Sequence, residues 1–180
     1  MNIKKYVKEA HKTATDHGFH DEPRQNEYWL MLIITEICEV VDADRKSGSF
    51  DGMEDFLERT NVHPDFAERY NVYIKGTVAE ELADICIRVF DFMGETNIKP
   101  STLSKIYMEP GPEFDELPLM VQCYNVIGAI IECDSQPINC KNILLIAEYW
   151  ARKYNIDLEW HIRTKMEYNK LRPIYNGKRY

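Results

Sequence analysis

The chain has 180 residues, 44% of them hydrophobic and 29% charged, and its formal net charge at pH 7 is −8. This length supports a substantial core, so we expect one domain over residues 1–180, and the negative charge disfavours binding to a nucleic acid polymer. No apolar run is long enough to cross a bilayer, and the N-terminus lacks the apolar core of a signal peptide. We therefore expect a cytoplasmic protein that binds no membrane.

Apolar residues recur with the helical period, and no stretch alternates between apolar and polar residues as a strand does. This pattern predicts an all-α helical bundle. A Pro-rich loop is predicted over 109–118, a short amphipathic segment is expected from Pro100 onward, and an insert at 47–75 should hold one or two short helices. The predicted helices run over 2–17, 24–46, 53–59, 65–70, 77–96, 117–134, 140–154 and 157–171.

The helix predicted over 24–46 contains the stretch WLMLIITEICEVVD, in which Glu36 and Glu39 interrupt an apolar run. Residues three apart lie roughly 60° from each other on one helical face. The apolar neighbours predict a helix that is buried nearly all round. Buried carboxylates need a proton, a partner or a cation, so these two acids require an explanation.

The helix predicted over 77–96 repeats this arrangement with Glu81 and Asp84. It opens with a capping box made by Thr77 and Glu80. If the two helices pack antiparallel, four carboxylates meet, and oxygen ligands of this kind favour Mg²⁺ or Mn²⁺ over zinc. The alternative is that Lys or Arg neutralises the acids, and Arg88 lies on the same stripe as Glu81 and Asp84.

The remaining titratable residues carry weaker signals. Residues 160–180 hold six Lys or Arg and a single Glu, which forms a basic tail on an acidic chain. The five cysteines contain no C-x-x-C and mostly have apolar neighbours, so we expect buried free thiols. The five histidines lie in polar stretches and are predicted to be surface residues: His11, His17, His20, His63 and His161.

An internal comparison suggests a second, degenerate copy of the acidic helix pair. Residues 119–132 align with 30–43, which places Asn125 on Glu36 and Gly128 on Glu39. Residues 139–156 align with 81–98, which matches Asn155-Ile156 to Asn97-Ile98. The acidic pair would then span about 24–98, and the second pair with the basic tail about 117–180. Chance similarity between amphipathic helices is the alternative.

The segments EICE (36–39) and ELAD (81–84) together resemble the ExxE…ExxD signature of the MazG-like, all-α nucleoside triphosphate pyrophosphohydrolases, relatives of the dimeric dUTPases. The ending KMEYNKLRP resembles the lysine, asparagine and Arg-Pro ending common in that family. The resemblance implies a MazG-like helical bundle and Mg²⁺-dependent hydrolysis of a (deoxy)nucleoside triphosphate to the monophosphate and pyrophosphate. It also implies a homodimer.

By this resemblance, Glu36, Glu39, Glu81 and Asp84 hold the metal, and Glu36 or Glu39 activates the attacking water. The phosphates would be contacted by Lys165, Asn169 and Arg172, which share one helical face. Trp29 would pack on the base or sugar, with core packing as its alternative role. Two other functions stay open: a catalytically inactive nucleotide-sensing module, and hydrolysis of phosphoribosyl-ATP.

Overall fold

In a computed structural model of the protein, residues 1–46, 50–103 and 110–177 are described, and all their regular structure is helical. This confirms the all-α prediction. The principal helices are α1 (Ile3–Asp16), α2 (Asn26–Arg45), α5 (Val78–Glu95), α8 (Leu119–Glu132), α9 (Gln136–Lys153) and α10 (Leu158–Lys170). Shorter ones are α3 (Met53–Glu58), η1 (Arg59–Asn61), α4 (Phe66–Tyr73), α6 (Pro100–Leu103), α7 (Pro112–Asp115) and η2 (Ile174–Gly177).

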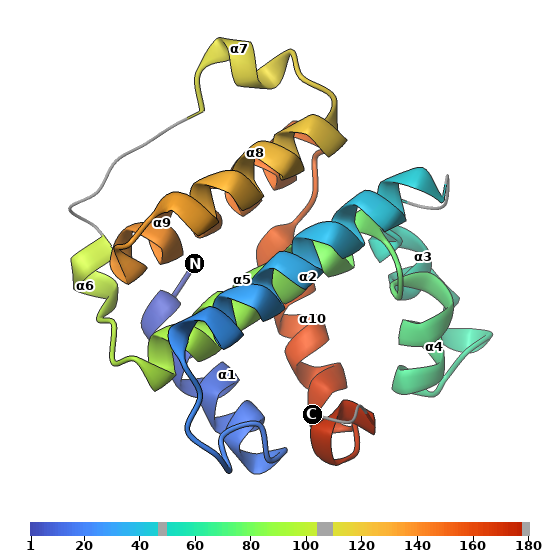
Figure 1. Cartoon of the computed structure of the whole chain (residues 1–180). Helices are drawn as coiled ribbons and strands as arrows, with labels where there is room; N and C mark the ends of the chain where they lie inside the picture. The colour runs from blue at the N-terminus through green and yellow to red at the C-terminus, as the bar shows by residue number, and fades with distance from the viewer. Residues whose placement is uncertain (47–49, 104–109, 178–180) are drawn as a thin grey trace.

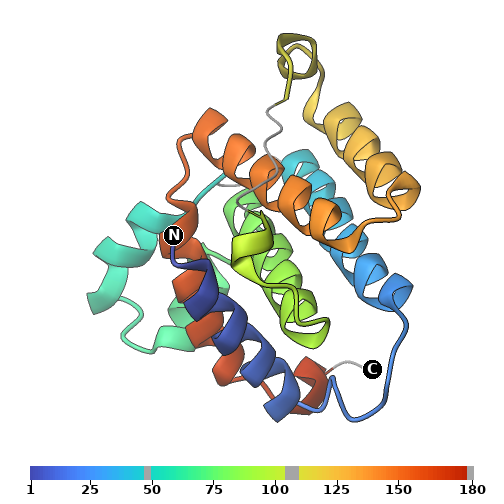
Figure 2. The same cartoon turned by 90° about the vertical axis from the view of Figure 1, so that its left-hand side faces the viewer.

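Helix α5 is the centre of the bundle, with α1, α2, α9 and α10 packed around it (Figures 1 and 2). Its side chains are buried on every face, as its apolar sequence predicts. Helix α8 packs on the outer side of α2, and α2 runs antiparallel to α5 (Figure 1). Most buried apolar side chains therefore form one continuous cluster around α5.

Local signals explain where the helices begin and end. Thr77 Oγ1 accepts a hydrogen bond from the Glu80 N–H at 3.1 Å, which confirms the predicted N-cap of α5. The Glu80 carboxylate accepts from the Gly76 N–H and not from Thr77, so only part of the predicted capping box forms. Asn97 and Asn155 end α5 and α9 with positive φ, each followed by an isoleucine N–H bonded to a carbonyl five residues back. The matching Asn-Ile pairs do not test the internal repeat, because many helices end with a residue of positive φ. The repeat stays a prediction.

The prediction that the 24–46 helix is buried nearly all round is wrong. Trp29, Ile33 and Val40 face the core, whereas Met31 and Cys38 are exposed. The reason is the position of α2: its inner face packs on α5 and part of its outer face on α8, and the rest of its surface is uncovered. The sequence is apolar on both faces, so it could not indicate which face is inside.

The insert folds as α3, η1 and α4 and forms a second, smaller core. Phe56, Tyr70 and Ile74 are buried there against Trp160 and Tyr168 of α10. Gly52 begins α3 with φ +76, and a Cβ at this position would lie 1.9 Å from the Tyr73 carbonyl oxygen. Only glycine fits this close approach, which fixes the insert on the end of α4.

Three other details bear on the sequence predictions. The Pro-rich segment contains α7 where a loop is expected, and the amphipathic segment is described only as α6, its continuation lying outside the described residues. All five cysteines are free thiols; Cys86, Cys123 and Cys140 are buried as predicted, whereas Cys38 is exposed and Cys133 is only partly buried. Within the described residues, no helix combines the length and hydropathy that a membrane span requires.

Candidate active site

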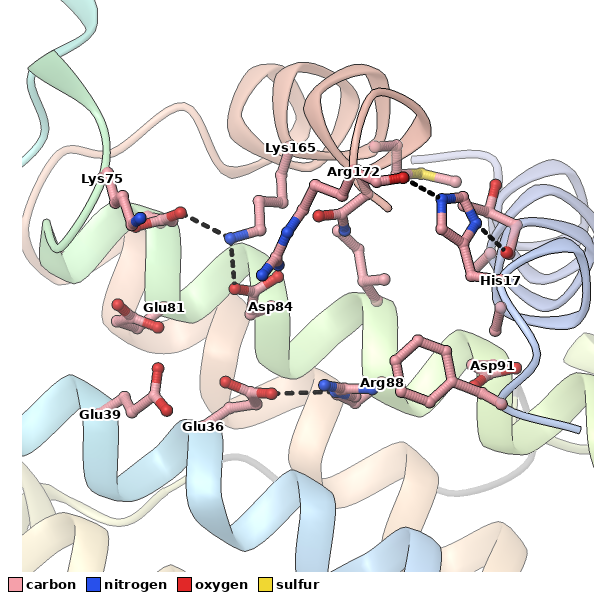
Figure 3. Close-up of a pocket in the computed structure, with 18 of the residues that line it drawn as sticks. His17, Glu36, Glu39, Lys75, Glu81, Asp84, Arg88, Asp91, Lys165 and Arg172 are labelled. Atoms are coloured by element: carbon pink, nitrogen blue, oxygen red, sulfur yellow. Dashed lines mark hydrogen bonds and ion pairs between the residues drawn. The ribbon is translucent and has the colours of Figure 1, made fainter. Parts of the chain in front are cut away.

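Three of the four predicted acids meet where α2 faces α5. One carboxylate oxygen each of Glu36, Glu39 and Glu81 lies within 4.8 Å of the others (Figure 3). Glu36 and Glu81 are buried, and Glu39 is exposed at the rim. The antiparallel packing produces this meeting, because it places the first turn of α5 beside the middle of α2.

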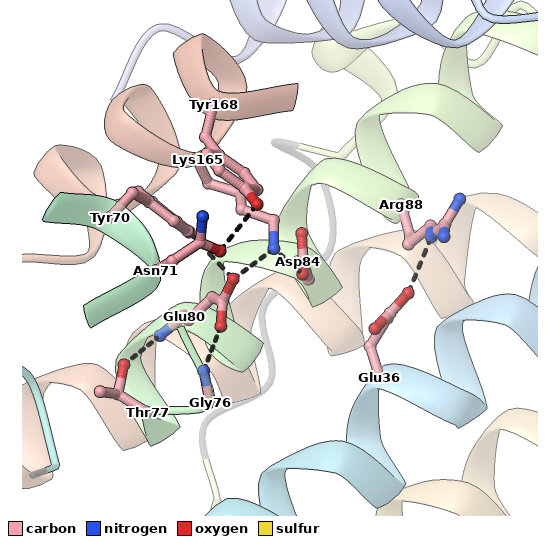
Figure 4. A network of polar contacts seen from close by, with 10 residues as sticks. All are labelled: Glu36, Tyr70, Asn71, Gly76, Thr77, Glu80, Asp84, Arg88, Lys165 and Tyr168. Carbon is pink, nitrogen blue, oxygen red and sulfur yellow. Dashed lines mark hydrogen bonds and ion pairs between the residues drawn. The ribbon is translucent and has the colours of Figure 1, made fainter. Parts of the chain in front are cut away.

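Asp84 lines the same cavity but has a partner of its own. Its Oδ2 lies 2.6 Å from Lys165 Nζ of α10, and it is not one of the acids grouped within 4.8 Å (Figure 4). The cavity therefore contains a group of three carboxylates and a neighbouring fourth that is already paired with a cation.

Glu36 is also paired, with Arg88, the arginine that the sequence analysis suggests as a counter-charge in place of a metal. Arg88 donates from Nε to Glu36 Oε1 at 2.9 Å, and both side chains are largely buried (Figure 4). Burial raises the pKa of Glu36, as do the charges of Asp84 and Glu39, while Arg88 acts in the opposite direction. The pKa remains above its ordinary value, so the single arginine does not fully offset burial and repulsion.

Glu81 is the acid that a cation would fit best. Its Oε2 is buried and has no hydrogen-bond partner in the described part of the chain. Burial, followed by the charges of Asp84 and Glu80, raises the pKa of Glu81 to about 9 although Lys165 acts against them. A buried carboxylate with this pKa is neutral at pH 7 unless a cation replaces its proton. The donor set of Glu36, Glu39 and Glu81 is all oxygen and suits Mg²⁺ or Mn²⁺.

A fifth acid, Glu80, belongs to the site although the sequence assigns it only to the helix cap. Lys165 Nζ lies 2.5 Å from Glu80 Oε1, and Tyr70 donates its hydroxyl hydrogen to the same oxygen at 3.1 Å (Figure 4). The Tyr70 ring stacks on Tyr168 at 4.1 Å between centroids. Burial lowers the pKa of Lys165, but the charges of Asp84 and Glu80 outweigh it and leave the pKa raised. Lys165 is therefore a fixed positive charge.

A cavity of about 380 Å³ extends from these acids toward α1. Asn169 and Arg172, two of the residues expected to contact the phosphates, line it, and the Asn169 Oδ1 is buried without a hydrogen-bond partner in the described residues. Arg172 reaches from the basic tail over the cavity toward Asp84 (Figure 3). Sequence reasoning missed several lining residues, among them Lys75, His17, Phe19 and Asp91. Lys75 lies at one end of the cavity, and His17 and Asp91 lie at the other (Figure 3). Only proximity in the fold reveals them.

Trp29 does not line this cavity. Its side chain is buried in the core, where it stacks on His20 with 4.6 Å between ring centroids. Trp29 therefore has the alternative role, which is packing in the core. Trp29 precedes Glu36 by seven residues, so it lies about two turns away along α2, beyond the end of the carboxylate group.

Two of the five histidines contradict the prediction that all are surface residues. His161 is 1% exposed, and its Nε2 lies 2.6 Å from Asp51 Oδ1. The His20 side chain is only 7% exposed because Trp29 covers one face of its ring. The burial comes from contacts with other segments, Asp51 for His161 and Trp29 for His20, which the sequence around each histidine does not indicate. His11, His17 and His63 are partly buried.

Comparison of the chain with models of known protein families, with curated proteins and with solved structures found no match. The chemistry of the site therefore has to be argued from its geometry. It combines an oxygen-donor group with arginine and lysine side chains that line the same cavity. This combination can hold a divalent cation and the anionic group that the cation binds.

Proposed function

We propose that this protein hydrolyses a (deoxy)nucleoside triphosphate to the nucleoside monophosphate and pyrophosphate in a Mg²⁺-dependent reaction. The observation that carries the proposal is the convergence of Glu36, Glu39 and Glu81 within 4.8 Å on the wall of a cavity also lined by Arg88, Lys165 and Arg172. The resemblance of the two acidic segments and of the C-terminal ending to MazG-like pyrophosphohydrolases supports the same reaction.

In this proposal Glu36, Glu39, Glu81 and Asp84 would hold the cation, and a bound cation would supply positive charge that offsets the charge of the phosphate groups. Mn²⁺ suits the same donors. Arg172 and Asn169 face the phosphate groups across the cavity. Lys165 holds Asp84 in place with one donor and Glu80 with another, which leaves its third N–H for a phosphate oxygen.

Glu39 is the better candidate for the general base. It is exposed to solvent and has no cationic partner among the described residues, whereas Glu36 accepts a hydrogen bond from Arg88. Glu39 would take a proton from the attacking water while the water oxygen forms a bond to the α-phosphorus. The bond from that phosphorus to the α–β bridging oxygen breaks, and pyrophosphate leaves.

The test is a pyrophosphate-release screen over ribo- and deoxyribonucleoside triphosphates and phosphoribosyl-ATP, with Mg²⁺ or with a chelator. We expect Mg²⁺-dependent turnover, and Glu39→Gln should lower kcat by about 10²–10⁴-fold, the usual contribution of a general base. Glu54→Gln, at an exposed acid of α3, is the matched control and should keep full activity.

A second function has a specific observation in its favour. Arg88 and Lys165 already pair with Glu36 and Asp84, so two of the four acids have cationic partners without a metal. A nucleotide-sensing module that does not turn over would retain this arrangement. Tight nucleotide binding to the wild-type protein with no pyrophosphate release from any substrate would replace the hydrolase proposal with this one.

A further inference from the structure

A second group of potential metal ligands lies at the opposite end of α5. One ring nitrogen each of His11 and His20 and one carboxylate oxygen of Glu95 lie within 4.8 Å of one another. His11 comes from α1, His20 from the loop after α1, and Glu95 from the last turn of α5. These segments and the start of α2 meet at one end of the molecule (Figure 1). None of the three residues lines the cavity of the candidate active site.

Asp91 orients the two imidazole rings. Its Oδ1 lies 2.8 Å from His20 Nε2 and 3.1 Å from His11 Nδ1, and its own side chain is buried. A histidine that binds a metal through one ring nitrogen commonly donates the N–H of the other to a carboxylate, which fixes the tautomer. When His20 donates from Nε2 to Asp91, its Nδ1 carries a free lone pair.

His20 Nδ1 is the nitrogen that is best placed to bind a metal ion. It is buried, lies 3.0 Å from Glu95 Oε2 and is outside hydrogen-bond geometry with any described residue. The His20 side chain is 7% exposed, with the Trp29 ring stacked on it at an angle of 21°. Two donors of one metal ion with bond lengths near 2.1 Å are separated by roughly 3.0–3.4 Å, so this spacing already suits a shared ion.

A glycine in α5 allows α1 to lie close to the end of α5, where the three residues meet. A Cβ added to Gly94 would lie 2.5 Å from the His11 Cβ, so glycine at this position lets α1 settle against the last turn of α5. The His11 and Glu95 side chains remain about one third exposed, at 32% and 34%. An ion and its water ligands therefore have a route from solvent to the buried His20 nitrogen.

We propose that His11, His20 and Glu95, with Asp91 as the positioning carboxylate, form a binding site for a divalent transition metal of the zinc class. Imidazole nitrogens favour Zn²⁺, Co²⁺ and Ni²⁺ over Mg²⁺, so this site differs in chemistry from the all-oxygen group near Glu81. Three protein ligands would leave a coordination position for water. The inference is independent of the proposed hydrolase function.

The experiment is titration of the metal-free full-length protein with Zn²⁺ by calorimetry and with Co²⁺ by visible absorption, both in excess Mg²⁺. We expect one Zn²⁺ per chain and Co²⁺ bands of nitrogen–oxygen coordination. Changes to positioning residues alone weaken metal sites by about 10- to 100-fold, so His11→Gln and His20→Gln should each raise the Kd at least about 100-fold.

Two controls separate this site from others. His63→Gln, at a histidine that pairs with Glu68 beside α4, should bind Zn²⁺ as the wild type does. Glu81→Gln should also retain it, because it alters only the carboxylate group. Circular dichroism checks that each variant folds. Should His20→Gln fail to fold, His11→Gln and Glu95→Gln, at partly exposed positions, decide the question.

The proposal is overturned if the wild type binds no stoichiometric Zn²⁺, or if His11→Gln binds it unchanged. It is equally overturned if Zn²⁺ is lost in Glu81→Gln and kept in the histidine variants, since the ion would then occupy the carboxylate group.

Discussion

Arg88 of α5 and Glu36 of α2 form a largely buried ion pair with 2.9 Å between Nε and Oε1, and this pair joins the two helices that supply the carboxylate group. Removing one member of a buried pair leaves an uncompensated charge, which typically costs about 3–5 kcal/mol. We therefore expect Arg88→Met to lower the free energy of unfolding by about this amount. Urea denaturation without metal measures it.

The double variant Glu36→Gln/Arg88→Met is the control for this pair. Because it removes both charges, it should recover most of the lost stability. A single Arg88→Met variant as stable as the wild type would mean that the pair contributes nothing and that Glu36 is neutral in the metal-free protein.

The raised pKa of Glu81 leads us to expect that the stability of the metal-free protein falls as the pH rises. Its pKa is about 9 in the folded protein and ordinary in the unfolded chain, so the folded state binds more protons between these values. The metal-free protein should therefore lose stability as the pH rises from about 4.5 toward 9. Glu81→Gln removes this loss, so its stability relative to the wild type should increase with pH.

Urea denaturation in chelator at pH 5, 7 and 9 tests this, with Glu54→Gln as an exposed control. Mg²⁺ should narrow the difference between wild type and Glu81→Gln at high pH, because only the carboxylate can bind it. A stability difference that does not change with pH would show that Glu81 titrates normally.

Lys165 and Arg172 should have separable effects. Lys165 is buried between Glu80 and Asp84, so Lys165→Met should destabilise the fold by about 3–5 kcal/mol. Arg172 is half-buried on the tail, and Arg172→Ala should mainly lower kcat/KM, by about 1.5–3 kcal/mol or roughly 10- to 150-fold. Denaturation and steady-state kinetics on both variants distinguish the two roles.

If Arg172→Ala left kcat/KM unchanged, the phosphates would be held by the other cations that line the cavity, which are Lys75, Arg88 and Lys165. Lys165→Met with wild-type stability would instead remove the argument that Lys165 is a structural charge.

A homodimer through the outer faces of α2 and α8 is the remaining prediction. Met31, Met120, Tyr124 and Ile131 are exposed there, Tyr124 to 76%, and covering such a surface is favourable. Sedimentation at micromolar concentration should give a dimer, and Tyr124→Lys should give a monomer. Val62→Lys, an exposed apolar position on the insert, should stay dimeric. A monomeric wild type contradicts this assignment.

The sequence predicts the helices well because their ends carry local signals. Asn2, Thr77 and Asp157 each accept a hydrogen bond from a backbone N–H in the first turn of a predicted helix. The convergence of Glu36, Glu39 and Glu81 is also predictable, since two antiparallel apolar helices bring together the acids that interrupt them. The predicted fourth acid, Asp84, lies outside this group because Lys165 pairs with it.

What the sequence does not reveal are contacts between distant segments. Lys165 meets Glu80 and His161 meets Asp51 across 85 and 110 residues, and no periodicity encodes such pairs. Nor does the apolar sequence of α2 distinguish the core-facing Ile33 from the exposed Met31. The partner of a buried charge is fixed by packing, which a pattern of residue types does not specify.

The burial of α5 on all faces has a consequence for the motions available to both sites. Glu81 and Glu95 lie 14 residues apart on this one helix, so about 21 Å of continuous helix separates them. Its central amides should exchange with deuterium only when the whole chain unfolds, since no local opening exposes them. A motion that admits a ligand to either site must then be a movement of α1, α2 or α10 relative to α5, which itself stays in place. Exchange rates in α5 would report global stability, while those of its neighbours would report access.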